Sequence, residues 1–259
     1  MSDFPIPNFS IDLSGQVALV TGSATGLGRR FARVLAAAGA KVAIAGRRVG
    51  LLEELAREID AAGGVSVPIR IDMTDTDSII AAVDAVEQAL GTITILVNNA
   101  AIPDAQRANK MSIELINAVI DTNLRGPFVL ACEVARRLIN RKLPGRMVNM
   151  SSMAAFKYDG NSAAALYSIT KAGIVRMTET LAVEWARFGI NVNGIAPGAF
   201  ASEMVSGMIQ RVGDFSVNFP RKRFGDPAQM DSTLLYLVSP SSEFVTGTVI
   251  KVDDGQSAR

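Results

Sequence analysis

Histidine is absent from this chain of 259 residues, and cysteine occurs only once. Without histidine, the side chain that most enzymes use as general acid or base is missing, so proton transfer needs another group. The single cysteine, Cys132, excludes an intrachain disulfide and is typical of a reducing compartment. Because Cys132 lies among apolar residues of a predicted helix, we interpret it as a buried structural thiol. We expect no metal site.

An excess of one charge and long apolar runs are also missing. The chain has 26 basic and 25 acidic residues, which are interleaved and give a net charge of +1. This balance predicts neither nucleic acid nor an anionic membrane as a partner. No run approaches the ~20 apolar residues of a membrane span, and residues 1–13 lack the features of a signal peptide. We therefore expect a cytoplasmic protein with an N-terminal arm at residues 1–13.

Short β-branched runs alternate with longer helical patterns along the rest of the chain. The runs predicted as strands are Val17–Thr21, Lys41–Ala45, Val65–Ile71, Ile93–Val97, Met147–Met150, Asn191–Ile195 and Val249–Val252. The predicted helices are Gly28–Ala38, Leu51–Ala61, Thr76–Leu90, Ser112–Leu138, Tyr167–Phe188 and Pro227–Leu237. Most of the strands lack polar alternation, as expected of strands buried on both faces. Residues 14–259 are therefore predicted to form a single α/β domain, a doubly wound parallel sheet of Rossmann type with helices on both faces.

One long connection, residues 197–223, breaks this alternation. It contains five large apolar side chains: Met204, Met208, Phe215, Val217 and Phe219. Long connections in compact domains are often lids or binding loops, so we expect a substrate lid at about residues 198–223. A surface insertion with a small core of its own is the alternative.

Tyr167 and Lys171 are four residues apart in a predicted helix and therefore share a face. A free tyrosine has a pKa of about 10 and is a poor base at neutral pH. A nearby ammonium in a partly desolvated cleft would lower that pKa toward about 7, at a cost of roughly 4 kcal/mol. Neither Tyr158 nor Tyr236 has a basic residue at this offset. The spacing makes Tyr167 the candidate acid or base, with an exposed, inert pair as the alternative.

A glycine-rich turn, residues 21–28 with the sequence TGSATGLG, follows the first predicted strand and opens the first helix. Glycine allows a sharp turn and close approach of a ligand, and the helix N-terminus offers free N–H groups to a pyrophosphate. The spacing Gly-x3-Gly-x-Gly differs from the usual Gly-x-Gly-x-x-Gly pattern. We interpret it as a dinucleotide site, with a plain glycine turn as the alternative.

The second predicted strand ends at Gly46, followed by Arg47 and Arg48. In dinucleotide-binding folds an acidic residue near this point binds the 2′-hydroxyl of the ribose, whereas arginine accommodates a 2′-phosphate. Gly46 removes the acid, and Arg47 supplies a planar fork of donors. This pattern favours NADP(H) over NAD(H), unless both arginines are merely solvated.

Taken together, the motifs resemble those of the short-chain dehydrogenase/reductases of roughly 250 residues, from about Leu13 to Gly255. Besides the glycine turn and the Tyr-Lys pair, the matching residues are Asp72, Asn98-Asn99-Ala100, Asn123, Ser151-Ser152 and Pro197-Gly198. The resemblance implies that these groups meet at the ends of the strands and bind a nicotinamide cofactor.

The resemblance also implies a role for each catalytic residue. Tyr167 would be the acid or base, and Ser152 would hydrogen-bond the substrate oxygen. Lys171 would lower the pKa of Tyr167 and bind the nicotinamide ribose, while Asn123 would help to hold a water that connects Lys171 to solvent. Alternatives are that Ser151 replaces Ser152 and that Asn123 only satisfies a helix kink.

The implied cofactor-binding residues come from every part of the domain. They are Gly22, Ser23, Thr25, Gly26, Leu27, Gly28, Arg47, Arg48, Asp72, Met73, Asn99, Ala100, Tyr167, Lys171, Pro197, Gly198, Phe200 and Ser202. Asp72 could instead be a helix or turn cap. Two departures from the family pattern are Ala101 and Asp254, each in place of a glycine, and the loop around Lys157–Asp159 is longer than usual.

The side chains expected around the substrate are mostly apolar: Ile102, Met153, Ala154, Phe156, Phe200, Met204 and Met208. They favour a small-molecule secondary alcohol or ketone with an apolar body. Alternatives are a 3-oxoacyl thioester reductase, whose carrier would meet Arg211, Arg221 and Lys222, an NAD-dependent sugar or polyol dehydrogenase, and an inactive cofactor sensor. The resemblance further implies a homo-oligomer, a tetramer or dimer, with Ala172, Val175 and Leu181 at a helix contact.

Overall fold

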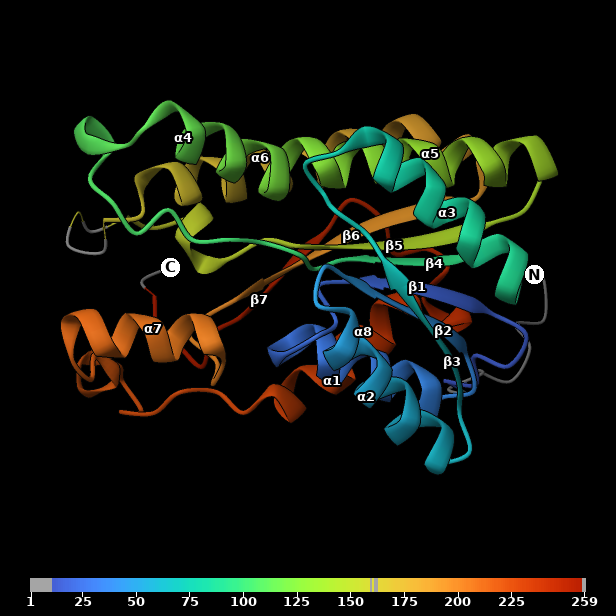
Figure 1. The fold of residues 1–259 in the computed structure, drawn as a ribbon, viewed down its shortest axis with the longest axis horizontal. Helices are drawn as coiled ribbons and strands as arrows, with labels where there is room; N and C mark the ends of the chain where they lie inside the picture. Colours follow the sequence, from blue (N-terminus) through green and yellow to red (C-terminus); the bar gives the residue numbers. More distant parts are fainter. Residues whose placement is uncertain (1–10, 159, 161–162, 258–259) are drawn as a thin grey trace, which may run out of the picture.

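The computed structural model describes residues 11–158, 160 and 163–257. In this part of the chain, parallel strands form one sheet in the order β3-β2-β1-β4-β5-β6-β7 (Figure 1). The strands are β1 (Val17–Thr21), β2 (Lys41–Gly46), β3 (Val65–Arg70), β4 (Ile95–Asn98), β5 (Gly145–Met150), β6 (Ile190–Pro197) and β7 (Val249–Val252). The predicted doubly wound α/β domain is confirmed.

Helices cover both faces of the sheet (Figure 1). They are α1 (Gly26–Ala37), α2 (Val49–Ala61), α3 (Thr76–Leu90), α4 (Ile113–Ile120), α5 (Gly126–Arg141), α6 (Ala165–Trp185), α7 (Glu203–Val212) and α8 (Asp231–Val238). One buried core joins the sheet to α3, α5 and α6, and a second joins it to α1, α2 and α8. Because both faces are covered, β1 and β4 are buried along their whole length.

The predicted helix over Ser112–Leu138 is interrupted in the structure. A π-helical turn, Asp121–Arg125, separates α4 from α5. Just after this turn, Gly126 lies against the loop that follows β3, where an added Cβ would be 2.3 Å from the main-chain oxygen of Met73. The extra residue of a π turn commonly marks a functional site, and here it carries Asn123 inward.

The two segments outside the regular alternation differ from their predicted descriptions. Leu13 is 1% exposed and donates its N–H to the Ala38 oxygen at 2.8 Å, so it belongs to the domain, whereas residues 1–10 of the predicted arm lie outside the described part. The segment predicted as a lid contains α7 and also a small aromatic core, which is the feature expected of the alternative, a surface insertion. Phe215, Phe219 and Phe224 meet edge to face, with centroids 5.1 to 6.0 Å apart.

The sheet order places the site. The chain crosses from β3 on one side of β1 to β4 on the other, so β1 and β4 are neighbours at the switch point. Ligands of doubly wound sheets bind outside the carboxyl ends of the strands at this point. In Figure 1, α7 and α4 lie beyond those ends. Among the described residues, no helix is long and apolar enough to cross a membrane.

Candidate active site

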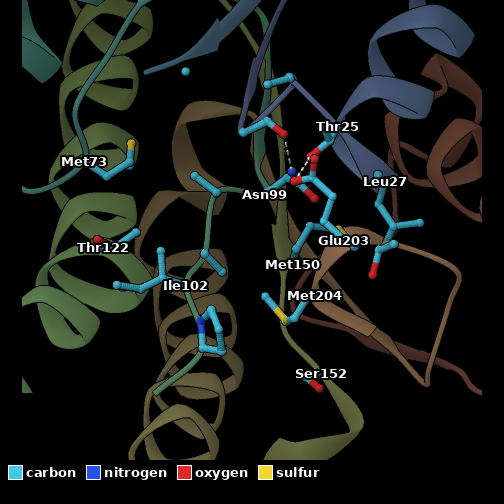
Figure 2. A pocket seen from close by; sticks show the side chains of 18 of the residues that line it. Thr25, Leu27, Met73, Asn99, Ile102, Thr122, Met150, Ser152, Glu203 and Met204 are labelled. Atoms are coloured by element: carbon cyan, nitrogen blue, oxygen red, sulfur yellow. Dashed lines mark hydrogen bonds between the residues drawn. The ribbon is translucent and has the colours of Figure 1, made fainter. Parts of the chain in front are cut away.

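A cavity of about 660 Å³ opens at the carboxyl ends of the strands (Figure 2). It lies within the range typical of cofactor and small-molecule sites. Most of the predicted site residues line it: Gly22, Thr25, Gly26, Leu27, Arg47, Arg48, Asp72, Met73, Asn99, Ala100, Ser152, Tyr167, Lys171, Pro197, Gly198, Phe200 and Ser202. Residues far apart in the sequence therefore converge on one cleft, as the predicted strand ends required.

Two predicted cofactor contacts lie under the glycine turn instead of in the cleft. Ser23 is 0% exposed, donates its hydroxyl to the Val20 oxygen and accepts the N–H of Ala45 at 3.3 Å. A Cβ on Gly28 would come within 2.3 Å of the Gly22 oxygen, so Gly28 allows α1 to pack against the turn. Both residues shape the turn from beneath, and neither lines the cavity.

Asn99 ties the turn to the end of β4. Its Nδ2 donates to the Thr21 and Gly22 oxygens at 2.9 and 3.2 Å. Gly22 has φ of 67°, and an added Cβ would be 2.9 Å from the Cα of Ala100. A left-handed backbone with no room for a side chain requires glycine. The turn is therefore held open in the form that suits a pyrophosphate at a helix N-terminus.

Tyr167 and Lys171 share the cleft-facing side of α6, as their spacing predicted. Lys171 is 3% exposed, its Nζ donates to the Met150 oxygen at 2.7 Å, and it lies 5.6 Å from the centroid of the Tyr167 ring. Ser152, just after β5, hydrogen-bonds the Tyr167 side chain. The neighbouring Ser151 also lines the cavity, but its hydroxyl donates to the main-chain oxygen of Lys171 at 2.9 Å, so Ser152 is the serine that bonds to the Tyr167 side chain.

The predicted lowering of the Tyr167 pKa by Lys171 stays a prediction, because burial dominates the pKa of both groups in this arrangement. Burial raises the pKa of Tyr167 to about 12, against a lowering by the Ser152 hydrogen bond and with a further rise from Asp104. Burial also lowers the pKa of Lys171 to about 8. Desolvation disfavours the charged form of both groups, and the Lys171 amine is directed at a carbonyl, not at the phenol oxygen.

Asn123 lies behind the cleft, within the π-helical turn. Its Oδ1 accepts the N–H of Ile102 at 2.8 Å and its Nδ2 donates to the Ile102 oxygen at 2.9 Å. The side chain therefore fixes the loop after β4, and its place in an irregular turn matches the alternative of a satisfied kink. Its predicted role in holding a water stays a prediction.

Asp72 takes the turn-cap role as well as a place on the cleft wall. Its Oδ1 accepts the N–H and the hydroxyl of Thr74 at 3.1 and 2.9 Å. The Thr74 N–H bond is the main reason that the pKa of Asp72 is lowered, and the charge of Arg47 lowers it further. Arg47 therefore lies near Asp72 on the cofactor side of the cavity.

Glu203, which was not predicted, lines the same side of the cleft from α7. At the start of α7 it accepts from Arg48 at 3.2 and 3.1 Å and from the Thr25 hydroxyl at 3.0 Å, and Arg48 donates to Thr25 at 3.0 Å. Figure 2 shows Thr25 and Glu203 facing each other. The only signal in the sequence was an acidic residue next to Ser202.

The predicted substrate residues divide into two groups. Ile102, Phe200 and Met204 line the cavity, whereas Met153, Ala154 and Met208 do not. Phe156 is 42% exposed and stacks under the Lys251 amine at 4.2 Å from the ring centroid. Three of the apolar side chains expected around the substrate thus lie on the cleft wall.

Comparison with known proteins supports the geometry. A family model described as enoyl-(acyl carrier protein) reductase matches residues 22–257. The 2-dehydro-3-deoxy-D-gluconate 5-dehydrogenase of Formosa agariphila is 33% identical over 251 residues, 94% of this chain and 93% of that protein. The 3-oxoacyl-[acyl-carrier-protein] reductase FabG of Thermotoga maritima is 34% identical over 244 residues, 94% of this chain and 98% of that protein.

A comparison with a solved structure points to the same family as the sequence relatives. A short-chain type dehydrogenase/reductase from Mycobacterium marinum has a TM-score of 0.93 at 34% identity, covering 96% of this chain and 98% of that one. The fold, the convergence of the predicted motifs on one cleft and these likenesses agree. The chain belongs to the short-chain dehydrogenase/reductase family and is an oxidoreductase that acts on CH–OH groups with a nicotinamide cofactor.

Proposed function

We propose that this protein is an NADP(H)-dependent oxidoreductase that interconverts a secondary alcohol and a ketone on a substrate with an apolar body. The observation that carries the proposal is the meeting of Ser152, Tyr167 and Lys171 on one wall of a cleft whose other end is the glycine turn. Proton-transfer groups and a dinucleotide cradle in one cavity suit hydride transfer to or from a carbonyl carbon.

In this proposal the side chains handle the proton and the developing charge. The nicotinamide, when bound, supplies or accepts the hydride. In the reductive direction the Tyr167 phenol donates its proton to the carbonyl oxygen, and the Ser152 hydroxyl stabilises the charge that develops there. A pKa of about 12 keeps the Tyr167 phenol protonated at neutral pH, which suits the donor role. The buried amine of Lys171, four residues further along α6, would hold a ribose hydroxyl of the cofactor.

The preference for NADP(H) rests on the end of β2. Gly46 lines the cleft without a side chain, and a Cβ there would have only Leu52 within 4 Å, at 3.7 Å. The Arg47 side chain beside this gap offers the planar donors that a 2′-phosphate prefers. Arg48 is the second cation of the pair, although Glu203 holds it in this structure.

The substrate wall supports an apolar body. Ile102, Pro103, Phe200, Met204 and Val205 line the cavity and offer carbon and sulfur to a ligand. The FabG relative makes a 3-oxoacyl thioester the main alternative. One of the three cations proposed to meet a carrier is engaged, because Arg221 pairs with Asp254 at 3.1 Å. The gluconate-type relative keeps a sugar acid as the second alternative.

The proposal is tested by a panel of ketones, 3-oxoacyl thioesters and sugar acids, followed at the nicotinamide absorbance with NADPH and with NADH. We expect the highest kcat/KM for an apolar ketone with NADPH. A higher kcat/KM for a sugar acid with NADH would contradict both the proposed substrate class and the proposed binding of the 2′-phosphate by Arg47. Turnover of the 3-oxoacyl thioesters but of no other substrate in the panel would favour the alternative, a 3-oxoacyl thioester reductase.

We also propose that the protein is a homo-oligomer built on α5 and α6, the two long helices. Of the residues predicted at the contact, Ala172 is exposed but Leu181 is only 4% exposed and belongs to the core. Instead, Ile169 and Val183 of α6 and Phe128 of α5 are 65%, 81% and 47% exposed. Exposed apolar side chains on adjacent helices suit a subunit contact. Light scattering on the purified protein, with Val183→Glu as the disrupting variant, tests this assembly.

A further inference from the structure

Asp104 is a buried carboxylate that the predicted site did not include. It lies in the loop between β4 and α4 and is 3% exposed. Its Oδ2 accepts the main-chain N–H groups of Leu166 and Tyr167 at 2.9 and 3.0 Å, and its Oδ1 accepts the N–H of Ala105 at 2.7 Å. A buried carboxylate that accepts three N–H groups is strongly held in place.

These bonds cap the catalytic helix from another segment of the chain. The N-cap of α6 is Ala164, which has no side chain to cap the helix, and its first turn contains no acidic residue. Side-chain caps normally accept the N–H of the second or third helical residue. In α6 those residues are Leu166 and Tyr167, so Asp104 takes the place of the missing cap and also meets the positive end of the helix dipole.

Hydrogen bonds continue from this cap into a closed circuit around the catalytic tyrosine. Asn123 holds both main-chain groups of Ile102, two residues before Asp104. Asn123 Nδ2 also donates to the Thr170 hydroxyl at 3.4 Å, and that hydroxyl donates to the main-chain oxygen of Tyr167 at 2.8 Å. The loop after β4, the π-helical turn and the first turn of α6 are therefore joined at Tyr167.

The backbone at both ends of this junction is strained. Ala105 has φ of 52° and Ala163, just before α6, has φ of 47°. Alanine rarely adopts this left-handed region, and such conformations persist where the surroundings fix them. The Asp104 carboxylate holds the N–H of Ala105 itself. Because the backbone of Ala105 is both strained and hydrogen-bonded, we infer that the conformation of this loop is constrained.

We propose that Asp104 is a positioning residue for proton transfer, which caps α6 from across the cleft and fixes the Tyr167 hydroxyl relative to Ser152. This inference rests on the proposed function of Tyr167. It also gives a role to the loop after β4. Ile102 and Pro103 of this loop line the cavity, and Asp104, the next residue, accepts the main-chain N–H of Tyr167.

A positioning carboxylate at this place also has an electrostatic effect. Its negative charge raises the pKa of Tyr167, whereas the Ser152 hydrogen bond lowers that pKa. Lys171 is the charged group that faces the tyrosine from α6 itself. In the reductive direction Tyr167 must be protonated, so the rate falls as the pH rises through its pKa. Removing the charge of Asp104 therefore moves this fall in rate to lower pH.

The first experiment compares Asp104→Ala with Asp104→Asn in steady-state reduction. Misplacing a catalytic group by about 1 Å costs on the order of 100-fold, so we expect that loss in kcat for Asp104→Ala, with NADPH affinity within twofold of the parent. Asparagine is as good a helix cap as aspartate, and its single carboxamide oxygen can accept the N–H groups of Leu166 and Tyr167, although its Nδ2 cannot accept the N–H of Ala105. Asp104→Asn should therefore recover most of kcat and show the alkaline fall in rate at lower pH.

The matched control is Asp75, which caps α3 by accepting the N–H of Asp77 at 2.9 Å and does not line the cleft. Asp75→Ala loses a helix cap without touching the site, so it should lower the melting temperature but leave kcat and the pH profile unchanged. Equal losses of kcat in Asp75→Ala and Asp104→Ala would overturn the positioning role. A kcat within twofold of the parent in Asp104→Ala would overturn it as well.

The second experiment does not depend on turnover. In Asp104→Ala the amides of Leu166 and Tyr167 should exchange with deuterium faster, whereas those of the middle of α6 should not change. Unchanged exchange at both amides would overturn the cap. Failure of every ketone in the panel would instead count against the proposed function while leaving the exchange result standing, so the two failures are distinguishable.

Discussion

The two ends of the cleft are built on opposite principles. At the catalytic end, Lys171 and Asp104 are at most 3% exposed, and their polar atoms are bonded to main-chain groups. At the cofactor end, the side chains of Arg48 and Glu203 are 52% and 62% exposed and bond to each other. Buried charges act strongly and exposed pairs weakly, because water screens the latter. The side chains of the catalytic end are therefore held in one position, whereas Arg48 and Glu203 of the cofactor end can each exchange the other for a different partner.

The sharpest way to break this contrast is to remove the phenolic oxygen. Tyr167→Phe deletes the proton donor but leaves the ring, so kcat should fall by roughly 1000-fold, within the range attributed to general acid catalysis. NADPH binding, measured by fluorescence, should persist. Substantial turnover by this variant would refute the assignment of Tyr167.

Lys171→Met tests the cost of burying a cation at the catalytic end. Burial lowers the pKa of Lys171 to about 8 from 10.5, so the folded state disfavours the charged amine. The wild type loses stability as the pH falls from 10.5 through 8, by about 1–3 kcal/mol at neutral pH. The variant should therefore be inactive yet more stable than wild type in urea at pH 7. That advantage should shrink at pH 10, and an advantage that grows would contradict the sign.

Arg47→Ala probes the cofactor end. Loss of a charge-assisted bond to phosphate should weaken NADPH binding by roughly 10- to 100-fold and leave NADH binding within twofold. Isothermal titration with both cofactors measures the ratio. Arg57→Ala on α2, away from the cavity lining, is the matched control. Equal weakening for the two cofactors would show that Arg47 does not recognise the 2′-phosphate.

Glu203→Gln should have the smallest effect. The variant releases Arg48 from its carboxylate partner, so NADPH should bind about two- to fivefold more tightly, as expected of an exposed ion pair. High salt should reduce the difference between the variant and the wild type. Weaker NADPH binding in the variant would instead make Glu203 part of the cofactor site.

Much of this organisation was readable from local patterns. The alternation of apolar runs with helical periods predicted the sheet, and motifs at strand ends predicted the cleft, because parallel strands present their carboxyl ends at one edge. Errors arose where a feature has no local signature. The extra residue of the π turn at Asn123 is invisible to helical periodicity, and a glycine motif does not tell that Ser23 turns inward.

By itself the sequence determined the fold class, the family and the spacing that unites Tyr167 with Lys171. Only the tertiary structure decided the pKa values of the Tyr167 phenol and the Lys171 amine, because these values depend on burial by segments that are distant in the chain. It also decided the partners of Asp104 and Glu203, which lie 62 and 155 positions away. A single acidic residue in a loop has no period or motif, so folding alone reveals which helix or arginine it meets.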